Sequence, residues 1–103
     1  MDDLTRAGLR AADQDRLLPG EREGLATSHE DDAAHWTQVY SELSEFKRGL
    51  LDSIEQKRNR TQSEAAIELD NDLVLMRAEL RRLDGRLGYW NERLRSLRNG
   101  GSP

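Results

Sequence analysis

The chain has 103 residues, which allows one small domain, and hydrophobic and charged residues each make up 35% of it. With a mean hydropathy of −0.91, it has too little apolar mass for a compact globule and suits an elongated helical assembly. The only prolines are Pro19 and Pro103, and helix-forming residues dominate the second half, so we expect an all-α fold. The net charge of −4 disfavours nonspecific binding to nucleic acid.

Several classes of protein are disfavoured by what the sequence lacks. It has no cysteine, which excludes disulfides, thiolate metal sites and thiol nucleophiles. No stretch approaches 18 apolar residues, and the Met-Asp-Asp start does not resemble a signal peptide, so we expect a cytoplasmic protein that does not span a membrane. Fourteen arginines against two lysines are typical of GC-rich coding and hint at a bacterial source.

Residues 1–27 are expected to form an acidic, largely disordered arm. Residues 1–32 hold nine acidic and four basic side chains, and the leucines of the arm follow no sustained period. The alternative is one short helix that ends at Pro19-Gly20.

A first amphipathic helix is predicted over about 28–58. Thr27 or Ser28 can cap its start, and three acidic residues at 30–32 favour the positive end of the helix dipole. The apolar residues then recur at helical spacing and define its inner face: Trp36, Val39, Tyr40, Leu43, Phe46, Leu50 and Ile54.

A break is predicted near residue 60. Asn59 suits a helix end, and Thr61 with Glu64 forms a capping-box pattern. The apolar stripes before and after the break are out of register by two residues, which is not a usual coiled-coil discontinuity. A single helix would point the stripes in different directions, so we expect an antiparallel helical hairpin over 28–99.

The second helix is predicted over about 62–98, followed by a flexible tail at 100–103. Its large apolar residues alternate steps of four and three, which is the coiled-coil period. The stripe consists of Leu69, Leu73, Met76, Leu80, Leu83, Leu87, Trp90, Leu94 and Leu97. With the chain folded near residue 60, its last turns extend past Trp36 and need another cover.

Apolar residues outside this stripe indicate a second partner. Ile67, Val74 and Leu75 would stay exposed in an isolated hairpin, so we expect two hairpins to form a four-helix bundle, with isolated surface residues as the alternative. The predicted interface and core residues are Trp36, Tyr40, Leu43, Phe46, Leu50, Ile67, Val74, Leu75, Leu80, Leu87, Trp90, Leu94 and Leu97.

The sequence offers little material for catalysis or metal binding. His29 and His35 are six residues apart, which places them on different helix faces, and no phosphate-binding loop, nucleophile elbow or zinc motif occurs. We therefore predict no enzymatic activity, no catalytic residues, no metal and no cofactor.

Arginines along the second helix provide an alternative function. Arg77 and Arg81 are four residues apart, as are Arg82 and Arg86, so each pair can hold an anion from one helix face. The other interpretation is that arginines flanking the stripe pair with acidic residues of the first helix.

The sequence thus predicts a non-enzymatic protein–protein interaction module, regulatory or adaptor in role, that acts as a homodimer or with a helical protein partner. The alternative is a regulator linked to an anion, a nucleotide or a nucleic acid through the arginine face.

Overall fold

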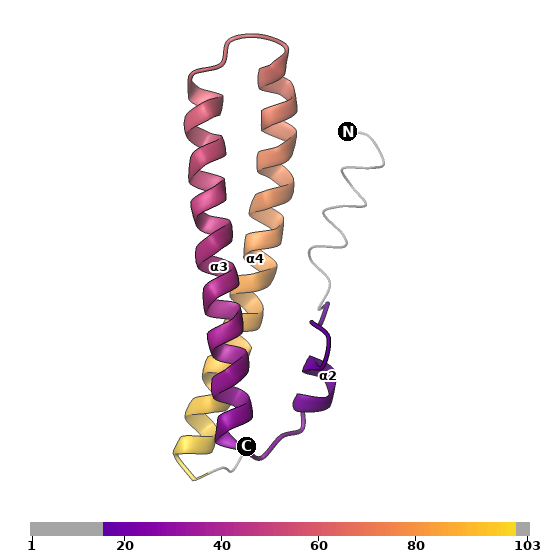
Figure 1. Ribbon diagram of the computed structural model, residues 1–103, viewed down its shortest axis with the longest axis vertical. Coiled ribbons are helices and arrows are strands. Elements are labelled where there is room, and N and C mark those ends of the chain that lie inside the picture. Colours follow the sequence, from indigo (N-terminus) through magenta and orange to yellow (C-terminus); the bar gives the residue numbers. More distant parts are fainter. Residues whose placement is uncertain (1–15, 101–103) are drawn as a thin grey trace.

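The computed structural model describes residues 16–100, which contain three helices and no β-strand. The helices are α2 (Glu21–Gly24), α3 (Glu30–Asn59) and α4 (Ala65–Arg98). The two long helices pack against each other as an antiparallel hairpin, and α2 lies beside the end of the hairpin opposite the turn (Figure 1). The predicted all-α hairpin is therefore confirmed. Within the described residues, no helix is long and apolar enough to cross a membrane.

The ends of the helices use different caps from those predicted. At the start of α3, the Thr27 hydroxyl donates to Asp32 and accepts the backbone N–H of His29, which is the residue at the N-cap. At the turn, the Thr61 hydroxyl donates back to the carbonyl of Lys57, 2.7 Å away, so the predicted capping box does not form. As a result, each helix starts two or three residues later than the sequence pattern indicated.

The stripe of α4 faces the interior as predicted, since all nine of its large apolar residues are buried or half-buried. Helix α3 is rotated relative to the prediction. Its buried residues are Ala33, Tyr40 and Ser44, and half-buried Leu51 and Ile54 continue this line. The inner face of α3 thus carries the small Ala33 and Ser44 beside Tyr40. The larger Leu43, Phe46 and Leu50, which were predicted to face inward, are turned toward solvent.

The register of the hairpin is marked by ion pairs between the two helices. Near the turn Arg58 pairs with Asp70 at 2.6 Å, and at the open end Arg98 pairs with Glu30 at 2.7 Å. The start of α3 therefore lies opposite the end of α4. This corrects the expectation that α4 extends past its partner, because the pairing is offset from the one predicted by a fold at residue 60.

Residues 16–29, which we call the strap, are placed against the open end of the hairpin. Leu18–Glu21 form a turn in which the Glu21 N–H donates to the Leu18 carbonyl and Gly20 has a φ of 86°, as in a type II turn with proline second and glycine third. This differs from the expected disordered arm, because Glu21 is fully buried and hydrogen-bonded. Residues 1–15 of that arm and residues 101–103 of the tail lie outside the described residues.

Candidate functional site

The Glu21 carboxylate is the centre of a buried polar cluster. Trp90 donates its indole N–H at 2.7 Å, and Arg86 donates twice, at 2.7 and 3.2 Å, all to the same carboxylate oxygen. The other oxygen accepts the Tyr40 hydroxyl and, at 2.9 Å, the Leu18 backbone N–H. We call the three hairpin donors Tyr40, Arg86 and Trp90 the carboxylate cage.

Burial and pairing act in opposite directions on this charge. Glu21 is 0% exposed and Arg86 is 7% exposed, so a carboxylate without partners would be costly here. Burial alone raises the pKa of Glu21, but the hydrogen bonds from Tyr40, Trp90, Arg86 and Leu18 hold it below the ordinary value of 4.5. Burial, together with the hydrogen bond to Glu21, raises the pKa of Tyr40 to about 12. The cluster thus favours an ionised Glu21 beside a protonated Tyr40.

Aromatic side chains pack next to the cage. The rings of Trp36 and Trp90 stack with their centroids 6.2 Å apart, and half-buried Leu18 and Leu25 of the strap pack against this core. A Cβ at Gly24 would lie 3.0 Å from the Trp36 indole nitrogen. At this point of the strap, a side chain would be crowded against the Trp36 indole.

Four further bonds hold the strap along α4. The Arg16 guanidinium donates to Glu79 at 3.4 Å, and Arg82 donates to the Arg16 carbonyl at 3.0 Å. Tyr89 donates to the carbonyl of Leu25 at 3.5 Å, and Arg93 donates to that of Thr27 at 2.6 Å. These contacts follow α4 toward its C-terminus in step with the strap sequence. The strap is thus an extended ligand of the hairpin, with Glu21 as its only buried charge.

A second feature lies on α3, between the strap and the turn. Leu43, Phe46 and Leu50 are 37%, 59% and 40% exposed, and half-buried Val39 precedes them. Since a helix turns about 100° per residue, their steps of four, three and four place these residues along one face. We call this set the α3 stripe. It is the longest run of exposed large apolar side chains on one face of a described helix.

The other residues of the predicted interface have different positions. Tyr40, Trp90 and Leu94 belong to the buried core, and Trp36, Leu87 and Leu97 pack against it; Leu80 is half-buried. On α4, Ile67, Val74 and Leu75 are exposed, but Leu75 lies about 100° around the helix from Val74. The α4 residues therefore do not form one stripe.

The four arginines of the predicted anion site are not brought together. Arg77 pairs with Glu55 at 3.1 Å, Arg82 with Glu79 at 2.7 Å, and Arg86 with Glu21. Arg81 is exposed and has no hydrogen bond or ion pair within residues 16–100. Because carboxylates already neutralise three of these four guanidinium groups, the arrangement gives little support to the alternative function.

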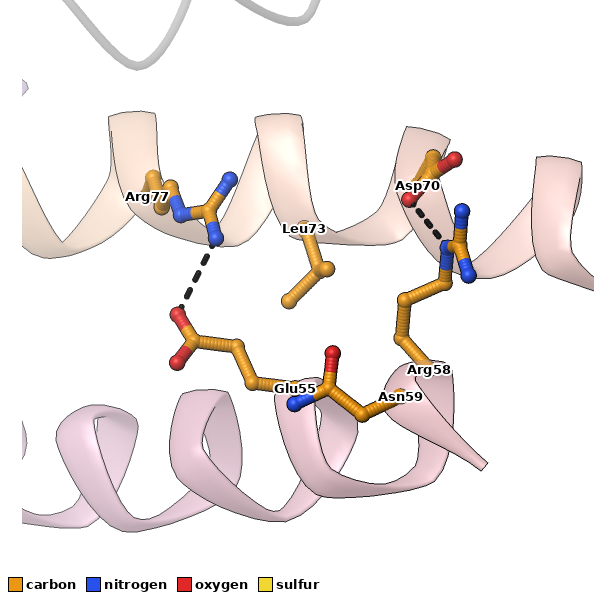
Figure 2. Close-up of a pocket in the computed structure, with 6 residues that line it drawn as sticks. All are labelled: Glu55, Arg58, Asn59, Asp70, Leu73 and Arg77. Atoms are coloured by element: carbon orange, nitrogen blue, oxygen red, sulfur yellow. Dashed lines mark hydrogen bonds and ion pairs between the residues drawn. The ribbon is translucent and has the colours of Figure 1, made fainter. Parts of the chain in front are cut away.

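A recess of about 360 Å³ near the turn is also lined by charged residues that pair with each other (Figure 2). Arg77 reaches across to Glu55 and Arg58 to Asp70, with Leu73 between the two ion pairs. All four charged groups that line the recess are thus engaged in these two ion pairs. Among residues 16–100, no cluster of His, Cys, Asp or Glu has the arrangement of a metal site.

Neither the burial of Glu21 nor the role of the strap could be predicted from the sequence. One local signal was present, since Leu18-Pro19-Gly20-Glu21 is a favourable type II turn sequence. The same residues also fit the end of a short helix, and a single glutamate among many acidic residues gives no sign that it will be buried. The chain matches no protein-family model, and no curated protein and no solved structure resembles it significantly.

Proposed function

We propose that this chain is a non-enzymatic protein-interaction module that pairs with a second copy of itself through the α3 stripe. The observation that carries the proposal is the exposure of Leu43, Phe46 and Leu50 along one face of a long helix. Such a face is stabilised when another apolar helix covers it. Two hairpins joined in this way form a four-helix assembly suited to a regulatory or adaptor role.

The spacing of the stripe supports an antiparallel, two-fold arrangement centred near Phe46. In that arrangement Leu43 lies opposite Leu50 of the partner subunit, and each Phe46 lies beside its symmetry mate. Gly49 is exposed next to the stripe, and a Cβ at this position would meet no atom within 4 Å. A glycine in the middle of a helix lowers helix stability by about 1 kcal/mol relative to alanine. Close approach of a second helix at this position would explain why a glycine is present.

Sedimentation equilibrium of three full-length proteins tests this proposal. We expect the wild type to dimerise with a Kd in the micromolar range, and Phe46→Glu to sediment as a monomer of 11.8 kDa because it places charges at the centre of the interface. The matched control is Ile67→Glu, since Ile67 is 64% exposed but lies outside the stripe, and we expect it to dimerise like the wild type. A monomeric wild type at high micromolar concentration, or equal dimerisation of all three proteins, would contradict the proposal.

A further inference from the structure

The hairpin provides a preformed site for a carboxylate, and the strap occupies it. Arg86, Tyr40 and Trp90 come from two long helices and donate four hydrogen bonds to one side chain. Without Glu21, the site would present a cation, a hydroxyl and an indole N–H beside the stacked rings of Trp36 and Trp90. Charge-assisted donors in such a setting favour an anion strongly.

The strap also indicates what kind of ligand fits. Its turn brings the Leu18 N–H onto the carboxylate, and Gly20 adopts the left-handed conformation that this turn requires. Gly24, three residues after Glu21, lies against Trp36 where a side chain would be crowded. The recognised unit is therefore a glutamate at the end of a proline–glycine turn, followed by a glycine three residues later.

We expect separation of the strap from the hairpin to cost less free energy than separation of α3 from α4. Its regular structure is limited to the four residues of α2, whereas α3 and α4 pack along their whole lengths. Its hydrogen bonds to the hairpin converge on Glu21, involve single backbone carbonyls, or join side chains near its two ends, as Arg16 does with Glu79 and Thr27 with Asp32. Segments with few contacts open locally without global unfolding.

We propose that the carboxylate cage is a peptide-binding site, and that an acidic turn of this type in a partner protein displaces the strap. The strap then acts as an intramolecular competitor that keeps the site closed until such a partner is present. This proposal concerns a different surface from the α3 stripe. The two proposals are tested separately, because Phe46 lies outside the cage and we expect Phe46→Glu to leave peptide binding unchanged.

Peptide binding to full-length protein tests the proposal. The probe is a fluorescent peptide with the sequence of residues 17–27, which contains no tryptophan or tyrosine, and the control peptide carries glutamine in place of Glu21. We expect the Glu21→Ala protein to bind the glutamate peptide at least about tenfold more tightly than the glutamine peptide. The wild type should bind it more weakly than Glu21→Ala does, because a tethered strap competes at an effective concentration of about millimolar.

A second substitution tests whether the preference for the glutamate peptide over the glutamine peptide arises from the cage. In the Glu21→Ala protein, Arg86→Met should remove the difference between the two peptides. Equal binding of both peptides by Glu21→Ala, or no saturable binding by a helical Glu21→Ala protein, would overturn the proposal. If Glu21→Ala loses its helical circular dichroism, Glu21→Gln serves as the host, because its amide preserves the shape of the buried side chain.

Hydrogen exchange of the wild type tests displacement without any substitution. We expect the indole N–H of Trp90 to exchange faster than the backbone amides of Leu83 and Leu87, as it does if the strap opens alone. Exchange of all three only through global unfolding would overturn the proposal. A wild-type dimer that Glu21→Gln converts to monomer would also overturn it, because the cage would then serve a second copy of this chain.

Discussion

The two halves of the hairpin differ in how their apolar side chains are covered and in how their charged side chains are paired. At the open end, the strap covers the aromatic core and brings a carboxylate to a buried arginine. Toward the turn, the helices are joined by surface ion pairs such as Arg58–Asp70 and Glu55–Arg77, while the α3 stripe stays exposed. The hairpin therefore covers its apolar core at one end and leaves apolar side chains exposed toward the other.

Truncating one large aromatic residue in each half should give the largest contrast. Trp90→Ala removes a fully buried ring and a hydrogen-bond donor, so we expect a loss of about 3–5 kcal/mol in the free energy of unfolding. Phe46→Ala should cost less than about 1 kcal/mol at concentrations below the dimer Kd, because its ring is 59% exposed. Urea denaturation followed by circular dichroism measures both. Similar losses would contradict the division into two halves.

Breaking the buried ion pair should have the next largest effect. Glu21→Leu leaves the Arg86 charge buried without its partner, and we expect a loss of about 3 kcal/mol. The double variant Glu21→Leu with Arg86→Met should recover much of that loss, because no buried charge remains. A double-mutant cycle in urea gives the coupling energy. A matching cycle on exposed Glu55 and Arg77 should give less than about 1 kcal/mol, and equal couplings would argue against a special role for the cage.

The stability of the strapped end should depend on pH at both extremes. The pKa of Glu21 is lowered, so its contribution is present above pH 4.5 and is lost as the pH falls through the lowered value. The pKa of Tyr40 is raised to about 12, so its contribution is present below pH 10 and is lost between pH 10 and 12; it amounts to about 2–3 kcal/mol. Denaturation curves across pH should show both losses. Glu21→Gln should reduce the acid loss and Tyr40→Phe should remove the alkaline loss.

Glycine substitutions should distinguish the strap from the exposed surface of α4, with smaller effects on stability. Gly24→Ala places a Cβ 3.0 Å from the Trp36 indole, and we expect it to destabilise the protein by about 1–2 kcal/mol. Gly85→Ala lies on α4 with no atom within 4 Å of the new Cβ, so it should stabilise the protein by about 0.5–1 kcal/mol. Thermal denaturation gives the sign of each change. Stabilisation by Gly24→Ala would indicate that the strap does not pass close to Trp36.

The parts of the fold that follow from local periodicity could be predicted from the sequence. The four-three stripe of α4 and the break near residue 60 were sufficient to predict the hairpin. The rotation of α3 could not be predicted in this way. Apolar counts favour Leu43, Phe46 and Leu50 as its inner face, whereas in the structure small Ala33 and Ser44 lie inside and Tyr40 reaches Glu21.

The carboxylate cage was beyond the reach of periodicity because it depends on long-range pairing. Glu21 and Arg86 are 65 residues apart, and their contact forms only when the strap folds back along α4. Composition even favoured the opposite conclusion, since a segment rich in glycine and acidic residues is typical of disorder. In this chain the same glycines permit the turn at Gly20 and the close approach at Gly24.

The most direct test of the central claim, that the α3 stripe is an interface, is disulfide cross-linking. The chain contains no cysteine, so Phe46→Cys and the control Ile67→Cys each introduce a single thiol. Under mild oxidation at the same protein concentration, we predict that Phe46→Cys forms a covalent dimer much faster than Ile67→Cys, because two-fold pairing brings its thiols together. Equal or slower cross-linking of Phe46→Cys would contradict the account.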